Sequence, residues 1–154
     1  MTAFVHLHVR SEFSLKDSIV RIGDLVKTTL KAGMPAVAVT DLMNLYGLVK
    51  FYKGAEGKGL KPVFGSDLVV RDGDQLCDVT VLVMNEVGYS NLIRVISDAY
   101  INGQEMGEAI ASRKMLELCH EGLIILLGKR SDIGLALSGA DQQVTRDRLL
   151  AWMQ

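Results

Sequence analysis

The chain has 154 residues, of which 49% are hydrophobic and 23% are charged, and its formal net charge at pH 7 is −1. This length and composition are typical of one globular domain that buries roughly 70% of the surface of its unfolded chain. The weak net charge and the scattered Lys and Arg residues argue against a duplex-binding domain, which normally presents a basic stripe. No apolar run approaches the roughly 18 residues that a membrane-spanning helix needs, so we expect no membrane contact.

Two further features indicate the compartment. The first ten residues, MTAFVHLHVR, lack the long apolar stretch of a signal peptide. Cys77 and Cys119 lie far apart and outside any CxxC pattern, and we expect them to be buried, reduced thiols. Both observations favour a cytoplasmic protein.

Hydrophobic periodicity predicts strands that alternate with helices. Strands are expected over residues 3–9, 36–40, 62–70, 77–84 and 122–127. Helices are expected over residues 22–32, between a capping Asn44 and the breaker stretch 57–62, and over residues 87–100, 112–120 and 141–153. An Asp-Gly turn within residues 71–75 predicts a hairpin of the third and fourth strands. The helical stripe of Tyr89, Leu92, Ile93 and Ile96 is predicted to be core.

This alternation predicts an α/β fold with a mostly parallel sheet, in which polar side chains at the strand ends form the functional site. No internal repeat or linker divides the chain, so one domain is expected. The last residues, LLAWMQ, stop within a helical pattern. We therefore expect a piece of a longer protein.

The stretch HLHVR (6–10) raises the question of a metal site. Residues two apart on a strand share a face, so His6, His8 and Arg10 would lie side by side with Phe4. Two imidazoles at this spacing can bind one metal ion, but hydrogen-bonded polar side chains on a strand produce the same pattern. Arg10 favours the second interpretation, because its guanidinium is permanently cationic and cannot bind a metal ion.

Aspartates follow the predicted strands. Asp41 comes directly after the strand 36–40, where it is either a catalytic carboxylate or a cap of the next segment. Asp17 is either a site residue or part of a turn, and Asp67 lies near the end of the third strand. Asp78 lies within an otherwise apolar strand, and because an unpaired buried carboxylate is unfavourable, we expect a basic partner.

Longer strings carry a family resemblance. FVHLHVRSEFSLKDS, GMPAVAVTDLMNLYGLVKFYKGAEGKGLKPVFGSDLVV, VTVLVMNEVGYSNLIRVISDAY and EGLIILLG resemble, in this order, the N-terminal polymerase and histidinol phosphatase (PHP) domain of bacterial DNA polymerase III alpha subunits. The resemblance covers nearly the whole chain. It implies that residues 1–154 are a PHP domain fragment, the N-terminal part of a distorted (β/α)7 barrel.

The resemblance also implies that the first two metal motifs of the family are degenerate here. His8 and Asp17 match ligands of the first motif, whereas Arg10 replaces its second His. Asp41 is kept in the second motif, but Leu42 replaces the His that follows. An alkyl group and a permanent cation thus stand at positions where metal-binding members have ligands.

The later positions differ as well. Asp67 replaces a Glu, Asp78 replaces a His, and Lys129 replaces a Cys or His of the family. The residues of the implied degenerate pocket are His6, His8, Arg10, Asp17, Asp41, Leu42, Asp67, Asp78 and Lys129. The remnant ligand positions are His8, Asp17 and Asp67. The resemblance therefore implies no catalytic residue and no cofactor in this fragment, while the polymerase itself would use Mg²⁺.

The function that the resemblance implies is that of a scaffold. The parent chain would be a DNA-directed DNA polymerase, a nucleotidyltransferase of DNA replication, and this domain would dock the proofreading exonuclease subunit. Its other partners would be the remainder of the polymerase chain and, through the parent protein, DNA. The alternative is a metal-dependent phosphoesterase or 3′–5′ exonuclease of the PHP superfamily, with one ion held by the retained His8, Asp17, Asp41 and Asp67.

Two structural expectations follow. A barrel cut after about five strands would leave an unpaired sheet edge, so the fragment is expected to self-associate. Several carboxylates in one cluster also require a counter-charge. We expect Arg10 to form a bidentate pair with at least one of the aspartates, with Lys129 as a second source of positive charge.

Overall fold

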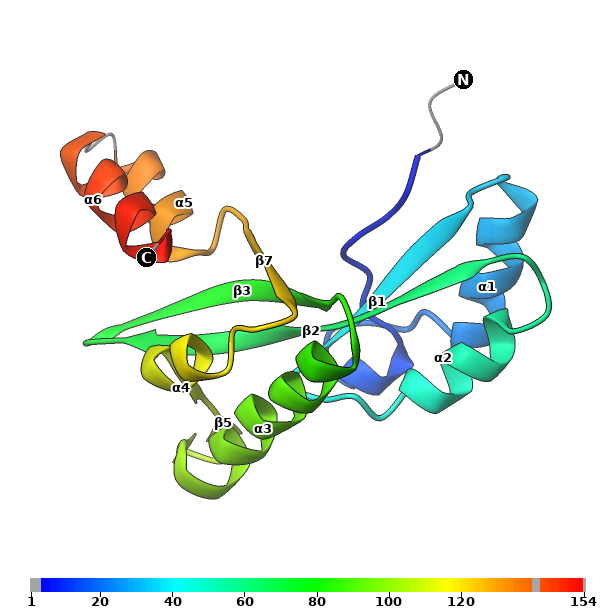
Figure 1. Ribbon diagram of the computed structural model, residues 1–154, viewed down its shortest axis with the longest axis horizontal. Coiled ribbons are helices and arrows are strands. Elements are labelled where there is room, and N and C mark those ends of the chain that lie inside the picture. The colour runs from blue at the N-terminus through cyan, green and yellow to red at the C-terminus, as the bar shows by residue number, and fades with distance from the viewer. Residues whose placement is uncertain (1–3, 140–141, 154) are drawn as a thin grey trace.

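A computed structural model describes residues 4–139 and 142–153, which form one main sheet with helices packed around it (Figure 1). The main strands follow the order β1-β2-β3-β7. They are β1 (Ala36–Leu42), β2 (Lys61–Asp72), β3 (Gln75–Val83) and β7 (Leu123–Leu127). The short β6 (Ala111–Ser112) pairs with the far end of β2, and β4 (Gln104–Glu105) and β5 (Glu108–Ala109) form a separate hairpin.

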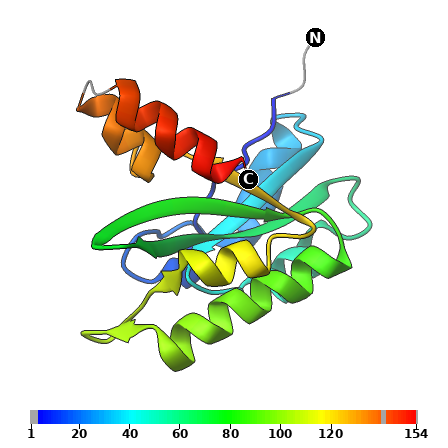
Figure 2. The same ribbon diagram turned by 60° about the vertical axis from the view of Figure 1, so that its left-hand side comes forward.

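The sheet is mixed rather than mostly parallel, which corrects one expectation. β1 and β2 are parallel, but β2 and β3 are antiparallel because Gly73, with φ 59°, turns the chain back directly. β3 and β7 are also antiparallel. The two predicted helices lie between them: α3 (Glu86–Asn102) runs back along β3, and α4 (Arg113–Leu118) runs forward again (Figures 1 and 2). The predicted hairpin and the α/β class are confirmed.

Two apolar clusters hold these layers together. On one face of the sheet, Leu68, Val79 and Val81 pack with Leu92 and Val95 of α3. The second cluster joins β1 to α1 (Ile22–Lys31) and α2 (Leu48–Ala55) through the buried side chains of Ile22, Val26, Val37 and Phe51. Asp67, Asp78 and Thr80 lie on the other face of β2 and β3, and the candidate site lies there.

The predicted first strand, residues 3–9, is wrong in its extent. Residues 1–3 lie outside the described residues, and His6 makes only an isolated parallel bridge to Val37. Ala38 N–H donates to the His6 carbonyl and Thr40 N–H donates to the Val9 carbonyl, so the segment follows β1 as a loose extended chain. The segment then bends into a 3-10 turn at Glu12–Ser14, because its polar side chains bond to aspartates of β1 and β2 rather than continuing a ladder.

The other helices and strands largely follow their predicted ranges, with differences at the ends. α2 begins at Leu48 after Gly47, and Asn44 does not cap it. Asn44 donates to the carbonyls of Phe13 and Leu42 and accepts from Tyr46 N–H, so it fixes the preceding loop. α6 covers Gln142–Trp152, and α5 (Asp132–Ser138) was not predicted.

The predicted core stripe of α3 is only half correct. Leu92 and Ile96 are buried, but Tyr89 is 39% exposed and Ile93 is 38% exposed. α3 packs on the sheet along a narrow line, so the flanking positions of its apolar face reach solvent. Both cysteines are buried free thiols, as expected, and burial raises the pKa of the Cys77 thiol. No helix among the described residues is long and apolar enough to cross a membrane.

A close approach of two backbones fixes the start of α3. Gly88 lies in its first turn against Gly122, which precedes β7, and a Cβ on Gly88 would lie 1.9 Å from the Gly122 carbonyl oxygen. Gly122 itself has φ 74°. Any side chain at Gly88 would therefore push α3 away from the sheet.

We predict that Gly88→Ala lowers the free energy of unfolding by about 3 kcal/mol, because the methyl group overpacks against rigid backbone. Gly23→Ala is the matched control, because nothing lies within 4 Å of its added Cβ in α1. That substitution should be neutral or stabilise by up to about 1 kcal/mol through helix propensity. Urea unfolding measures both, and equal stabilities of the two variants would contradict the close approach.

Candidate functional site

A hollow of about 560 Å³ lies where β3 and β7 meet the N-terminal segment. Its polar lining comes from three places: His8 and Arg10 before the 3-10 turn, Asp67 and Thr80 on paired positions of β2 and β3, and the loop after β7. The lining residues are His8, Arg10, Asp67, Asp78, Val79, Thr80, Leu126, Leu127, Gly128, Lys129 and Arg130. Five of the residues singled out from the sequence thus meet around one hollow.

Asp67 is the centre of this site. Its side chain is only 3% exposed, and both carboxylate oxygens accept hydrogen bonds. His8 Nε2 lies 2.7 Å and Arg10 Nε lies 2.6 Å from Oδ2, and the Thr80 hydroxyl donates to Oδ1 at 2.7 Å. Both oxygens of this buried carboxylate thus have partners, and one of these partners is a permanent cation.

Arg10 joins two aspartates. Its Nε donates to Asp67, and its Nη1 lies 3.3 Å from Asp17 Oδ2. The predicted pair between Arg10 and an aspartate is confirmed, but it is not bidentate with one carboxylate. The guanidinium divides its donors between a buried partner and Asp17, whose side chain is 41% exposed, so the pair with Asp67 contributes more.

Asp78 has the basic partner that we expected, although its side chain is 22% exposed and not fully buried. Arg130 Nη2 lies 2.6 Å from Asp78 Oδ2, and Asp78 N–H donates to the Arg130 carbonyl. The cation that pairs with Asp78 is thus Arg130, the residue that follows Lys129. Within residues 4–139 and 142–153, Lys129 makes no ion pair, although it lines the same hollow.

Asp41 does not join the cluster, contrary to expectation. It is 2% exposed, and its carboxylate accepts from Ser11 N–H, the Ser11 hydroxyl and the Ser14 hydroxyl at 2.6–2.7 Å. These bonds tie the 3-10 turn to the end of β1. The sequence left open whether Asp41 is a catalytic carboxylate or a cap of the next segment. The structure is closer to the cap, because Asp41 fixes a turn. This turn precedes β1, whereas the expected cap would follow it.

Two other expected residues also lie apart from the hollow. The ring of His6 contacts Phe4 edge-on, with centroids 4.7 Å apart. Leu42 packs against the apolar cluster between the sheet and α3. Neither side chain lines the hollow, so His6 lies apart from His8 and Arg10, which both bond to Asp67.

The donor set around the hollow does not fit the metal cluster that metal-binding members of the family would hold. Arg10 donates to Oδ2 of Asp67, and Thr80 donates to the other oxygen. Within the described part of the chain, no three His, Cys, Asp or Glu residues are arranged to hold an ion. A guanidinium at this place repels a metal cation and cannot replace a ligand.

Sequence reasoning missed four residues of this network: Ser11, Ser14, Thr80 and Arg130. Ser11 caps the turn that follows HLHVR and Ser14 is its last residue, and their spacing was a signal for a capped turn. Arg130 is adjacent to Lys129, so the basic partner of Asp78 was misplaced by one position. Thr80 faces Asp67 through the strand register, which local sequence does not reveal.

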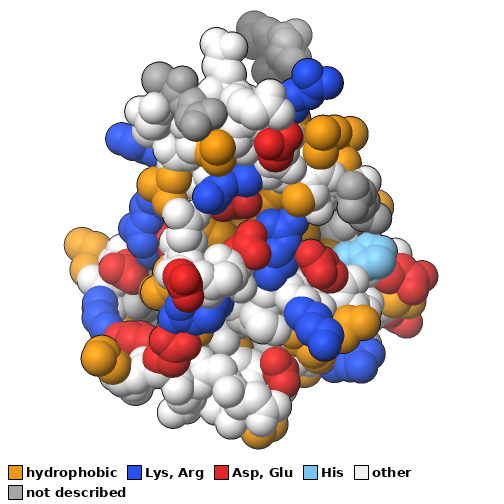
Figure 3. Space-filling model, turned by 90° about the vertical axis from the view of Figure 1, so that its left-hand side faces the viewer, with side chains coloured by type: hydrophobic (Ala, Val, Ile, Leu, Met, Phe, Trp, Pro, Cys, Tyr) orange, Lys and Arg blue, Asp and Glu red, His pale blue; other side chains and the backbone are white. Residues whose placement is uncertain are grey.

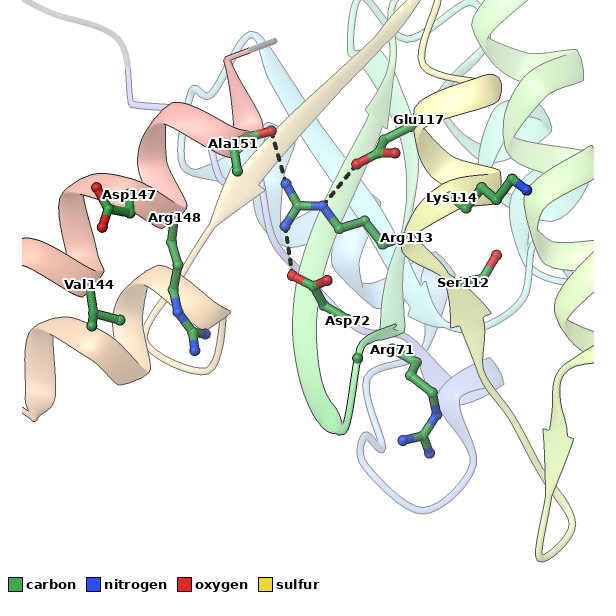
Figure 4. A pocket seen from close by; sticks show the side chains of 11 residues that line it. Arg71, Asp72, Ser112, Arg113, Lys114, Glu117, Val144, Asp147, Arg148 and Ala151 are labelled. Atoms are coloured by element: carbon green, nitrogen blue, oxygen red, sulfur yellow. Dashed lines mark hydrogen bonds and ion pairs between the residues drawn. The ribbon is translucent and has the colours of Figure 1, made fainter.

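A second hollow, of about 790 Å³, lies between the hairpin tip, α4 and α6 (Figure 4). Arg113 crosses it, with bonds to Asp72, Glu117 and the Ala151 carbonyl, and stacks 4.3 Å from the Trp152 ring. Burial alone would lower the pKa of Arg113, but Glu117 and Asp72 outweigh burial and raise it. Figure 3 shows this side of the molecule, where acidic and basic side chains intermix. The mixed charges indicate that Arg113 has a structural role, in which it holds α6 against α4 and the hairpin tip.

The mixed sheet, its covering helices and the polar hollow at the strand ends define an α/β domain of the PHP type. The PHP domain family model matches residues 6–154, and the chain belongs to this family. The fold is part of the (β/α) barrel-like architecture of that family.

The curated relatives are polymerase subunits. DNA polymerase III subunit alpha of Pseudomonas fluorescens is 44% identical over 155 residues, which cover 98% of this chain and 13% of the relative. The protein of the same name from Escherichia coli (strain K12) is 45% identical over 138 residues, covering 87% of this chain and 12% of the relative. The similarity lies in the N-terminal region of these subunits. The chain therefore spans about an eighth of the length of the curated relatives it matches.

A solved structure supports the fold. An amidohydrolase from Chromobacterium violaceum, with bound sulfate and no metal, has a TM-score of 0.51 and 18% sequence identity. The match covers 63% of this chain and 33% of that chain. At this identity the similarity concerns the arrangement of helices and strands.

We predict that Arg10→Ala lowers the free energy of unfolding by about 3 kcal/mol, because it leaves the buried Asp67 carboxylate without its cation. Arg71→Ala is the matched control, since Arg71 pairs with Glu105 on the surface. The control should lose less than about 1 kcal/mol. Chemical unfolding measures the free energy of unfolding of both variants. If Arg10→Ala loses no more of it than the control, the central role of the pair between Arg10 and Asp67 is contradicted.

Proposed function

We propose that this chain acts as the PHP domain of a DNA polymerase III alpha subunit, as a scaffold without catalysis of its own. The observation that carries the proposal is the Arg10 guanidinium between Asp67 and Asp17, at the positions that resemble the first and third ligand motifs of the family. The relatives, at 42–45% identity over most of the chain, support the polymerase context.

The chemistry of the hollow supports a structural role. Metal-dependent phosphodiester cleavage requires ions that activate water and neutralise the developing negative charge. Here the buried carboxylate is already neutralised by Arg10 and saturated by His8 and Thr80. The same bonds fasten residues 8–10 to β2 and β3. The site thus stabilises the start of the chain against the sheet, which is what a docking platform requires.

In the parent protein, nucleotidyl transfer with Mg²⁺ and the contacts to DNA would belong to regions beyond this domain. The net charge of −1 agrees with a domain that does not itself bind a phosphate backbone. The partner that we propose for the domain is the proofreading exonuclease subunit, because a domain that has lost its own hydrolytic site can still position a separate nuclease near the polymerase.

We predict that the purified chain binds the proofreading exonuclease subunit, as measured by isothermal titration calorimetry. Binding should persist unchanged in EDTA, because a scaffold needs no metal ion in its hollow. A parallel titration with the exonuclease lacking its C-terminal segment tests whether that segment carries the contact. If neither the chain nor the complete alpha subunit binds the exonuclease, the docking role is wrong.

We also predict that neither the wild-type chain nor Arg10→His retains zinc or manganese after dialysis, as measured by elemental analysis. The substitution supplies one imidazole, but Leu42 and Lys129 remain at two further family ligand positions. Stoichiometric metal in the wild-type chain, together with hydrolysis of a phosphodiester, would favour the alternative of a metal-dependent phosphoesterase or 3′–5′ exonuclease.

A further inference from the structure

The layer formed by α1 and α2 carries a local excess of positive charge, although the whole chain has a net charge of −1. Residues 21–61, which contain both helices, have seven Lys and Arg residues and three Asp and Glu residues, and one of these three is the buried Asp41. The rest of the chain has ten basic and 15 acidic residues. Positive charge is therefore concentrated on one layer of the domain.

The path of the chain gathers five lysines at one end of this layer. α1 leads into β1 and α2 leads into β2, and because these strands are parallel, both connections lie at the same end of the sheet (Figure 1, right). The register places Ala36 beside Lys61, at the start of both strands. The lysines come from the second half of α1, the end of α2 and the connection to β2. All are exposed, and we call them the lysine face: Lys27, Lys31, Lys53, Lys58 and Lys61.

The charge of the lysine face is largely uncompensated. Within residues 4–139 and 142–153, four of its five lysines form no ion pair or side-chain hydrogen bond, and the fifth, Lys58, donates to the Gly54 carbonyl. Cations elsewhere in the domain have acidic partners, as Arg10, Arg71 and Arg130 do. The ammonium groups of the lysine face are thus available to a partner that brings negative charge.

Stabilisation of the helices accounts for only part of this charge. Lys31 and Lys53 lie in the last turns of α1 and α2, where a cation interacts favourably with the helix dipole. Each helix end presents about half a negative charge, so the two ends together amount to about one. Glu56 adds one acidic side chain directly after α2. With five lysines, an excess of about three positive charges remains.

Exposed apolar side chains lie beside these cations on α2. Val49 is 63% exposed and Tyr52 is 46% exposed, and with Lys53 they occupy helix positions i, i+3 and i+4, which share one face. The Tyr52 ring contacts the Phe64 ring, with centroids 6.4 Å apart, so it is held against the domain. The outer surface of α2 thus combines positive charge with apolar groups.

This combination fits an acidic protein segment better than a nucleic acid. A protein that binds duplex DNA tightly neutralises about six to ten phosphates, whereas the lysine face offers five cations in a chain of net charge −1. A phosphate backbone also has no apolar group that could cover Val49. A protein segment in which carboxylates lie beside apolar side chains supplies both kinds of contact, and the complementary charge favours its encounter with this surface.

We propose that the lysine face, together with Val49 and Tyr52, docks an acidic and partly apolar segment of a protein partner. The identity of the partner rests on the proposed scaffold function, so the segment belongs to the proofreading exonuclease subunit. Its carboxylates pair with the lysines, and its apolar side chains cover Val49. Among the described residues, none of α1 or α2 lines the hollow around Asp67, so docking here leaves the Arg10 network intact.

The test is a titration of the exonuclease subunit into charge variants of the chain, measured by isothermal titration calorimetry at low and high salt. Lys53→Glu/Lys61→Glu should raise the dissociation constant on the order of tenfold at low salt, because each reversed charge turns attraction into repulsion. Lys53→Gln/Lys61→Gln removes the charges without reversing them and should raise it about threefold. Both effects should shrink at high salt. Circular dichroism checks that the variants fold, which is expected because both positions are exposed.

Arg94→Glu/Lys114→Glu is the matched control, because it makes the same change of net charge at exposed positions of α3 and α4. It should leave the dissociation constant unchanged. If the wild-type chain binds the exonuclease and the lysine variants bind it equally well, or if the control weakens binding as much, the lysine face is not the docking surface, although the scaffold function stands. If neither the chain nor the complete alpha subunit binds the exonuclease, the scaffold function is wrong and this inference fails with it.

A parallel titration with duplex DNA tests the other kind of partner. The wild-type chain should show no binding of the duplex at physiological salt, because the lysine face has too few cations for it. Duplex binding that Lys53→Glu/Lys61→Glu abolishes, together with unchanged binding of the exonuclease, would identify the lysine face as a nucleic-acid surface and overturn the proposal.

Discussion

The buried carboxylate of Asp67 is the constraint on which the rest of this domain depends. It lies on the central strand β2, on the face of the sheet that no helix of the main core covers. An ionised group at such a place is tolerated only with partners, and here they come from two separate parts of the chain. Arg10 and His8 reach it from the N-terminal segment, and Thr80 reaches it from β3. One side chain thus joins the beginning of the chain to the centre of the sheet.

Asp41 is a second buried carboxylate, and its hydrogen-bond partners are of a different kind. It is buried at the end of β1, next to the strand that carries Asp67, but its partners are hydroxyl and backbone donors of Ser11 and Ser14 rather than a cation. The two aspartates together determine the path of residues 8–14. This path explains why the N-terminal segment leaves β1 after a single bridge, since the bonds to side chains replace those of a longer ladder.

The positive charge beside the carboxylates of this site comes from arginine side chains. In a metal-binding site the carboxylates are held together by an ion that can exchange and activate water. A guanidinium provides the same neutralisation as a fixed part of the chain, with directional hydrogen bonds and no open coordination position. Arg130 repeats the arrangement with Asp78 at the other side of the hollow. The acidic residues of the hollow thus attach loops to strands.

The sequence by itself determined the α/β class, the hairpin after Asp72, the ranges of α1 and β2 and the need of Asp78 for a basic partner. These features depend on local periodicity, turn residues and the charge of individual side chains, all of which are encoded over short stretches. The motifs also singled out Arg10 and Asp67, although they did not show which aspartate Arg10 would bind.

Only the tertiary structure decided which strands pair and which polar residues meet. The direction of β7 depends on the two helices before it, and the contact of Thr80 with Asp67 depends on the β2–β3 register. Asp41 and Asp67 look equivalent in the sequence because both are carboxylates near strand ends. They differ because the β1–β2 register places Asp41 beside Ser66 and Leu42 beside Asp67, so the two carboxylates do not lie side by side. Their surroundings are supplied by segments distant in the chain.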